Sequence, residues 1–170
     1  ISGWERHDDR IKEAIKPMTK LLLINYPHNP TGAVITKTQQ KQLIEIARTN
    51  DLWIFSDEVY RNLELEPSNR LPTIASMYEK GISLGVMSKS FGLPGLRLGW
   101  IAAQSRQLLS ELSNVKHYLS ICNSAPSEVL ALIALRNKDK ILARNLDIIH
   151  SNITLLDDFF SDQVDLFAWA

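Results

Sequence analysis

The sequence predicts an α/β fold, with a mostly parallel sheet flanked by helices and a long C-terminal helix. Three observations support this prediction. Short apolar runs of strand length recur before Ser105 and end in polar or turn-forming residues. A segment with helical spacing separates the first two of these runs, as in a strand, helix, strand unit. From Ser105 onward the apolar pattern is helical almost to the end of the chain.

The first strand, helix, strand unit is expected in residues 19–60. The run TKLLLIN begins at Thr19 and is closed by YPHNPTG, which is typical of a strand that is buried on both faces and ends in a loop. Residues 36–50 are expected to form the helix, because a threonine that can act as N-cap precedes apolar residues near helical spacing. The second strand is expected in LWIFSDEVY, residues 52–60.

The remaining elements follow along the chain. The segment IASMYEK, residues 74–80, predicts a short helix, and ISLGVM, residues 82–87, predicts a third strand. The run LRLGWIAA, residues 96–103, follows too closely for a crossover helix, so we expect a hairpin-like or neighbouring strand there. Three helices are then expected, at residues 105–119, 124–137 and 139–162.

Composition limits the classes of function. With 170 residues, 45% of them hydrophobic, the chain can build one globular domain or a large piece of one. Its 19 basic residues balance 19 acidic residues, which argues against nucleic acid and membrane partners and favours a small molecule or another protein. The single cysteine, Cys122, cannot form an internal disulfide, which fits a reducing, cytoplasmic setting. No metal site is expected, because the histidines and the cysteine lack metal-ligand spacing.

Polar residues follow each of the first three expected strands. The clusters are NYPHNPTG, SDEVY and MSKSFG. Ligands of α/β sheets gather at the carboxyl ends of the strands. We therefore expect the three clusters to face one pocket.

Lys89 lies in the third cluster, within SKSFGLPGLRLGW. Partial desolvation beside the apolar Met87, Phe91 and Leu93 would favour the neutral, nucleophilic amine, which can form a Schiff base with a carbonyl. The alternative is an ordinary surface lysine. The neighbours favour a site, because hydroxyls, glycines that let backbone approach a ligand, and a guanidinium suited to phosphate surround the lysine. These neighbours are Ser88, Ser90, Gly92, Gly95 and Arg97. A lysine beside a phosphate clamp indicates a phosphorylated aldehyde.

The other two clusters offer groups for the same pocket. Asp57 ends the second apolar run, and an aspartate opposite a pyridine nitrogen would keep that nitrogen protonated; the alternative is a capping or loop residue. Tyr60 can bring a phenol to the pocket or pack against the core. Asn29 can direct its amide at a ring hydroxyl, although the run NPTG is also a turn by composition. His28 is expected to be a hydrogen-bonded structural residue.

Taken in order, NYPHNPTG, SDEVY and SKSFGLPGLRLGW resemble the fold-type I pyridoxal-phosphate enzymes, specifically the class I and II aminotransferases. The resemblance covers nearly the whole chain and implies the roles of five residues. Lys89 matches the lysine that holds pyridoxal 5'-phosphate as a Schiff base and moves the proton of the substrate's α carbon. Asp57 matches the partner of the pyridine nitrogen. Asn29 and Tyr60 match the residues that hydrogen-bond the ring 3-oxygen, and Arg97 matches the arginine that binds the phosphate.

The sequence also departs from the family pattern. Many members carry Ser or Thr three residues before the lysine as a phosphate ligand, but Val86 stands there, which leaves Ser88 as the candidate hydroxyl. Family members are longer, with an N-terminal portion and a C-terminal small domain. The chain begins without methionine and ends on the apolar run LFAWA, so residues 1–170 are interpreted as a partial cofactor-binding large domain that lacks both.

The resemblance implies a cytoplasmic, homodimeric aminotransferase that acts on an amino acid and a 2-oxo acid. Two alternatives stay open. A lyase, cyclase or decarboxylase would use the same scaffold and the same cofactor residues, because the protein only selects which substrate bond is aligned with the ring. The chain can also be a truncated fragment that folds, associates with itself and does not turn over.

Overall fold

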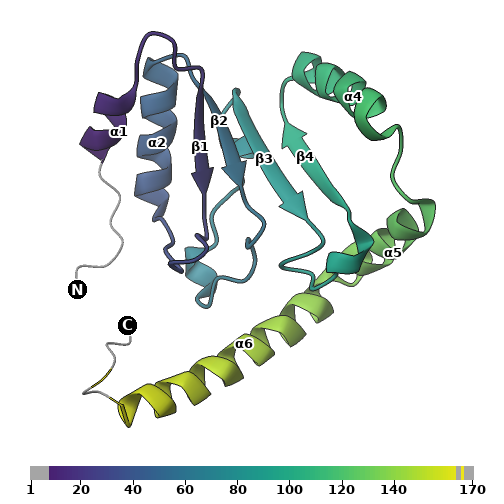
Figure 1. Cartoon of the computed structure of the whole chain (residues 1–170). Helices are drawn as coiled ribbons and strands as arrows, with labels where there is room; N and C mark the ends of the chain where they lie inside the picture. Colours follow the sequence, from purple (N-terminus) through teal and green to yellow (C-terminus); the bar gives the residue numbers. More distant parts are fainter. Residues whose placement is uncertain (1–7, 164–165, 167–170) are drawn as a thin grey trace.

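The computed structural model describes residues 8–163 and residue 166 of the chain. Its centre is a sheet with the strand order β1-β2-β3-β4 (Figure 1). Strands β1, β2 and β3 are parallel, and β4 pairs antiparallel with β3. The predicted class is confirmed, including the neighbouring fourth strand. The strands are β1 (Leu21–Asn25), β2 (Trp53–Asp57), β3 (Gly81–Val86) and β4 (Gly99–Ala103).

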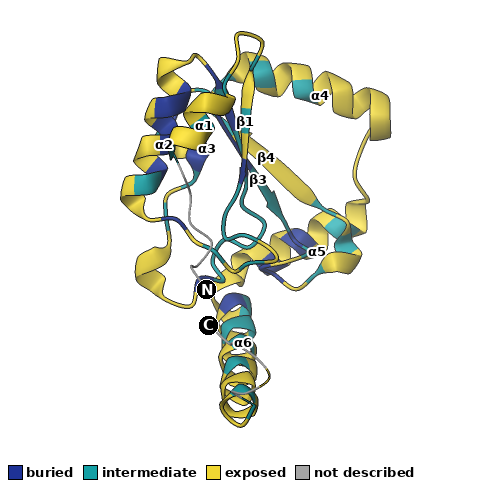
Figure 2. Ribbon diagram, turned by 60° about the vertical axis from the view of Figure 1, so that its left-hand side comes forward, coloured by how far each residue is buried: buried dark blue, intermediate teal, exposed yellow. Residues whose placement is uncertain are grey.

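Helix α2 (Lys37–Thr49) connects β1 to β2, as the sequence predicts. It begins at a capping box, in which the Gln39 amide donates to the Thr36 hydroxyl at 3.2 Å and the Thr36 amide donates to the Gln39 side chain at 2.8 Å. Its apolar residues, with those of α3 (Ile74–Met77), pack over one face of the sheet (Figure 2). This main core contains Ile24, Ile35, Leu43, Ile44, Ala47, Leu52, Ile54, Ile74 and Tyr78.

Three helices follow β4: α4 (Arg106–Ser120), α5 (Ala125–Arg136) and α6 (Lys138–Ser161). Each agrees with a predicted helix to within one residue at either end. Helix α6 runs along the side of the sheet at which β1, β2 and β3 end (Figure 1). A second, smaller core joins Met87 and Phe91, which follow β3, to Ala131 and Ala134 of α5. Ile141 of α6 packs against the same core, so the long helix lies next to the loop that carries Lys89.

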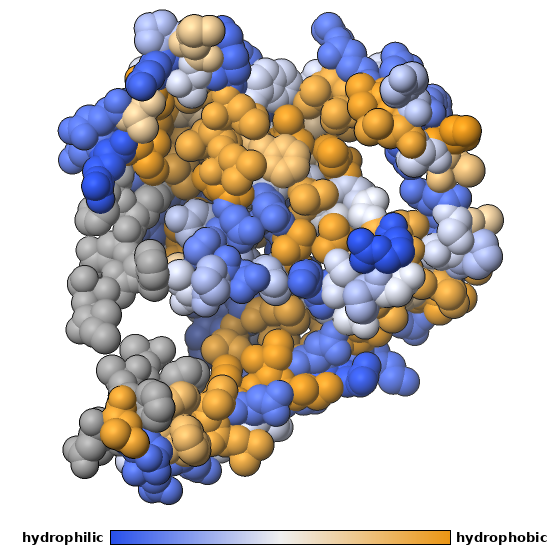
Figure 3. All heavy atoms as spheres, viewed as in Figure 1, coloured by the Kyte–Doolittle hydropathy of each residue, from blue (hydrophilic) through white to orange (hydrophobic). Residues whose placement is uncertain are grey.

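The sheet face opposite α2 carries exposed apolar side chains, among them Leu23, which is 65% exposed, and Ile101 of β4. In the view of Figure 3, apolar side chains gather over the strands. Helix α1 (Asp8–Ala14) was not predicted, because its short sequence is mostly charged; Ile11 and the following Ile15 pack against the main core. Among the described residues, no helix combines the length and the apolar character needed to cross a membrane.

Candidate functional site

The candidate site lies where the three parallel strands end. Asn25 of β1 pairs in register with Asp57 of β2, and Asp57 pairs with Leu84 of β3. The loops that follow β1, β2 and β3 therefore leave the same edge of the sheet, as the sequence predicts. They carry the three polar clusters.

Asp57 is held by its neighbours in the sheet. Its Oδ2 accepts a hydrogen bond from Nδ2 of Asn25 at 3.1 Å, and its Oδ1 accepts one from the amide of Val59 at 3.2 Å. Asp57 is half-buried. Each carboxylate oxygen can accept a further bond, so the group is oriented and still able to bind a cationic N–H. Asn25 was not predicted as a site residue, because only the register of β1 and β2 shows that it lies opposite Asp57.

Tyr60 and Lys89 come from different loops and meet. The Lys89 ammonium nitrogen lies 5.7 Å from the centroid of the Tyr60 ring, in a cation–π contact. Lys89 is exposed, whereas Met87 and Phe91 on either side of it are buried. The expected partial desolvation of Lys89 is therefore wrong in this structure, because the apolar neighbours turn into the second core and leave the amine on the other side of the loop.

The loop that carries Lys89 is closed by backbone hydrogen bonds. The Gly92 amide donates to the Lys89 carbonyl and the Leu93 amide donates to the Met87 carbonyl, each at 2.9 Å. Gly92 has φ of +65°, which a residue with a Cβ adopts only at a cost. The loop thus turns sharply and presents the amine at its tip.

Asn29 and Tyr60 line a groove with a volume of about 580 Å³. Asn29 is exposed and lies in a turn in which the Gly32 amide donates to the His28 carbonyl at 2.8 Å. His28 is hydrogen-bonded through Nδ1 to the Thr31 hydroxyl at 2.7 Å, in agreement with the structural role expected for it. Besides the segments after β1 and β2, the groove is lined by Ile149 and Ile153 of α6.

The two candidate phosphate ligands differ in their surroundings. Ser88 is half-buried. Arg97 is exposed, has a left-handed backbone conformation with φ of +51°, and donates from Nη1 to the Pro94 carbonyl at 3.1 Å. Neither residue lines the groove that contains Asn29 and Tyr60, and neither do Asp57 and Lys89. Asn29 and Tyr60 therefore line one groove, and Tyr60 contacts Lys89, whereas Arg97 takes part in neither arrangement.

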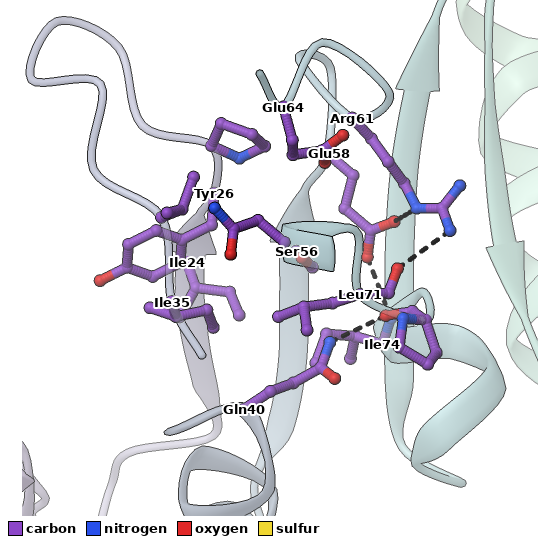
Figure 4. Close-up of a pocket in the computed structure, with 14 residues that line it drawn as sticks. Ile24, Tyr26, Ile35, Gln40, Ser56, Glu58, Arg61, Glu64, Leu71 and Ile74 are labelled. Atoms are coloured by element: carbon purple, nitrogen blue, oxygen red, sulfur yellow. Dashed lines mark hydrogen bonds and ion pairs between the residues drawn. The ribbon is translucent and has the colours of Figure 1, made fainter. Parts of the chain in front are cut away.

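A small cavity of about 40 Å³ lies behind this edge, between β1, β2 and the loop after β2 (Figure 4). Glu58, next to Asp57, lines it and is 10% exposed. Its Oε1 accepts hydrogen bonds from the Ile74 amide at 3.0 Å and the Ser83 hydroxyl at 2.7 Å. Sequence inspection missed Glu58, because its partners lie 16 and 25 residues further along the chain. It fixes the peptide that follows Asp57.

The groups with displaced pKa values lie elsewhere. Burial raises the pKa of the Tyr78 phenol, and a hydrogen bond from the Lys80 ammonium lowers the pKa of the Asp51 carboxyl. Asp51 and Lys80 precede β2 and β3, at the opposite end of the sheet. In the part of the chain that the structure describes, no three His, Cys, Asp or Glu side chains gather as a metal site.

Comparison with known proteins adds the family. The profile described as aminotransferase class I and II matches residues 3–166. The chain belongs to the class I and II aminotransferase family. A probable N-succinyldiaminopimelate aminotransferase of Mycobacterium tuberculosis is 34% identical over 143 residues, which are 83% of this chain and 36% of that protein. Capreomycidine synthase of Streptomyces vinaceus is 31% identical over 151 residues, 85% of this chain and 37% of that protein.

Solved structures agree with this assignment. A PLP-dependent aminotransferase from Streptococcus suis is 36% identical, with a TM-score of 0.86 over 94% of this chain and 42% of that one. The resemblance noted in the three sequence motifs and the fold-type I architecture are confirmed. The chain spans little more than a third of the length of the curated relatives that it matches.

Proposed function

We propose that the protein is a pyridoxal-phosphate-dependent aminotransferase, which transfers an amino group between an amino acid and a 2-oxo acid. The observation that carries the proposal is the meeting of the Lys89 amine with the Tyr60 ring, at the sheet edge where Asp57 ends β2. A nucleophilic amine, an aromatic phenol and an oriented carboxylate are the groups that this cofactor requires. They occur in a chain of the class I and II aminotransferase family.

The residues present fit the cofactor. Lys89 is exposed and can reach an aldehyde, and each oxygen of Asp57 can accept a further hydrogen bond. Arg97 presents an exposed guanidinium that suits a phosphate. When bound, the cofactor supplies an electron-poor ring that stabilises negative charge at the substrate's α carbon.

Each side chain then has a distinct task. Lys89 would hold the cofactor at its aldehyde carbon and, once its amine has been released, would move a proton to and from the substrate's α carbon. Asp57 would keep the ring nitrogen protonated. Asn29 and Tyr60 would orient the ring by hydrogen bonds to its 3-oxygen, and Arg97 would bind the phosphate with help from the Ser88 hydroxyl.

The same residues serve a second candidate function. One relative, which is 31% identical, is named capreomycidine synthase, so its name describes a synthesis and not a transamination. A lyase, cyclase or decarboxylase would keep the roles of Lys89, Asp57 and Arg97, because the choice among substrate bonds depends on substrate placement. The products separate the candidates: a 2-oxo acid whose amino group appears on the second 2-oxo acid indicates transamination. Free ammonia indicates a lyase, carbon dioxide a decarboxylase, and a cyclised amino acid a cyclase.

Further features of the proposal concern the assembly. We infer that residues 1–170 are part of a cofactor-binding large domain and that the remaining segments of a complete enzyme supply substrate contacts. A homodimer is supported by the exposed apolar residues of α4, α5 and α6. A cytoplasmic, reducing location is supported by a single cysteine, Cys122, which is free and exposed.

The test uses the full-length gene product. It is incubated with pyridoxal phosphate and reduced with borohydride, and peptide mass spectrometry then locates the modified lysine. We expect the label on Lys89, and Lys89→Ala is expected to lose the label and nearly all turnover. Lys41→Ala, which removes an exposed lysine of α2, is the matched control and is expected to keep both. A label on another lysine, or a Lys89→Ala variant with normal turnover, would contradict the proposal.

A further inference from the structure

The hydroxyl of Ser90 connects two loops of the candidate site. Ser90 follows Lys89 in the chain. Its Oγ lies 2.9 Å from the carbonyl oxygen of Val59 and 2.6 Å from that of Arg61, so its single proton is shared between two acceptors. Val59 and Arg61 are the residues on either side of Tyr60. One side chain therefore ties the residue next to the lysine to the carbonyls of the two residues on either side of the tyrosine.

This connection is buried, although the amine that it serves is not. Ser90 is 3% exposed. Its carbonyl accepts a hydrogen bond from Nδ2 of Asn145 on α6 at 2.9 Å, so the backbone of the lysine loop is also fixed from a third element. These partly buried hydrogen bonds resist local opening, because the buried Ser90 hydroxyl would otherwise be left without a partner. The distance between the Lys89 amine and the Tyr60 ring is consequently set by groups below the surface.

We propose that Ser90 is a positioning residue, which holds the Lys89 loop at a fixed distance from Tyr60 through its hydroxyl. The proposal rests on the proposed function, in which Lys89 and Tyr60 act on the same cofactor. Ser90 itself touches neither reacting atom. It acts by aligning the lysine loop with the loop after β2, with Asn145 fixing the same loop from α6. Misplacement of a reacting group by about 1 Å can cost on the order of 100-fold in rate, which gives such a connection a measurable effect.

Ser90→Ala removes the hydroxyl, and Tyr78→Phe is its control. Tyr78 is also buried, at 1% exposed, and its hydroxyl donates to the Leu52 carbonyl at 2.8 Å, near the start of β2 and β3 and away from the candidate site. Both substitutions remove a buried hydroxyl that donates to the backbone, so we expect similar decreases in thermal stability. In the full-length enzyme, we expect kcat to fall by roughly 10- to 100-fold in Ser90→Ala alone. Equal kcat values for the two variants would overturn the proposal.

A second measurement follows the lysine without cofactor. The full-length apoprotein is reductively methylated with ¹³C-formaldehyde, and the NMR signal of Lys89 is assigned by its loss in Lys89→Arg. Its chemical shift includes the ring current of Tyr60, which Tyr60→Leu removes. We expect Ser90→Ala, and to a smaller extent Asn145→Ala, to move the signal toward its position in Tyr60→Leu, whereas Tyr78→Phe leaves it in place.

The two readouts separate the proposals. A wild-type protein without transaminase activity would reject the proposed function, while the NMR signal would still decide whether Ser90 positions Lys89. An unchanged Lys89 signal in both Ser90→Ala and Asn145→Ala would reject the positioning role, even if both variants were less stable. Loss of kcat together with the displaced signal supports it.

Discussion

Gly92 provides a sharp test of how the lysine loop is built. It has φ of +65°, and its amide closes the loop on the Lys89 carbonyl at 2.9 Å. A Cβ at this position would lie 3.4 Å from Nδ2 of Asn145, which is ordinary contact with the end of a side chain. Gly92→Ala therefore introduces backbone strain three residues after Lys89 and adds little steric crowding.

The magnitude follows from two opposing effects. A residue with a Cβ pays about 1–2 kcal/mol in the left-handed region. Alanine also restricts the unfolded chain, which offsets about 0.4–1 kcal/mol of that cost. The net loss for Gly92→Ala is about 1 kcal/mol, or a decrease in Tm of about 2–4 °C for a chain of this size. Strain in the loop should also displace the amine, so we expect kcat of the full-length enzyme to fall by on the order of 10-fold.

Two other glycines serve as controls. Gly32 has φ of +70°, and no atom lies within 4 Å of the place that a Cβ would take, so Gly32→Ala carries the same backbone strain in another turn and is the control for stability. Gly95 has neither a positive φ nor a close neighbour, so Gly95→Ala is expected to be neutral or slightly stabilising. Calorimetry is measured for all three variants, and steady-state kinetics for Gly92→Ala and Gly95→Ala. If Gly92→Ala were as stable as Gly95→Ala, or turned over as fast, the reasoning would be refuted.

Three further predictions concern stability and assembly. Tyr78→Phe removes the phenol that donates to the Leu52 carbonyl at 2.8 Å, so we expect a loss of about 1–2 kcal/mol at neutral pH in urea unfolding. Because burial raises the pKa of Tyr78, its contribution is complete below pH about 10 and is lost as pH rises through the raised pKa, so the difference between the two proteins should shrink in alkali. Lys80→Met removes the partner that lowers the pKa of Asp51, so the variant should be less stable than the wild type at neutral pH. This difference in stability should disappear as pH falls below about 4 and through the lowered pKa. A difference that persists in acid would contradict the pairing. The exposed apolar residues of α4 to α6 predict a dimer or larger assembly in light scattering, and a monodisperse monomer at all concentrations would reject this.

Much of the fold could be predicted because local signals and tertiary packing agree. The capping box at Thr36 and the buried periodicity around Leu43 specify α2 without reference to other elements. The strands expected at residues 82–87 and 96–103 leave too short a connection for a crossover helix, so a hairpin-like or neighbouring strand could be predicted, and the structure shows that it pairs antiparallel. Helix α1 carried no comparable signal, because its two N-terminal aspartates favour a helix start but seven residues are too few for a stable helix without the packing of Ile11.

The candidate site was predictable to the extent that topology determines it. Parallel strands end at the same edge, so a polar residue such as Asp57 that directly follows an apolar run can be assigned to that edge from the sequence. The exposure of Lys89 could not be assigned in this way. Met87 and Phe91 enter the second core while Lys89 between them is exposed, so the loop does not follow strand alternation, and its turn depends on where α5 packs against Phe91.

The roles that sequence inspection missed, including that of Ser90, which was expected to offer its hydroxyl to a ligand, share one physical property: they depend on partners that are distant along the chain. The Ser90 hydroxyl bonds to carbonyls 29 and 31 residues before it, and Asn145 reaches Ser90 from 55 residues away. Serine and asparagine are common in loops, so their identities indicate nothing about such bonds before the fold is known. The residues that we propose to bind the cofactor occur in recognisable clusters at strand ends, whereas the residues that align them are determined by tertiary contacts. For this reason the lysine loop could be found from sequence, but its alignment with Tyr60 required the structure.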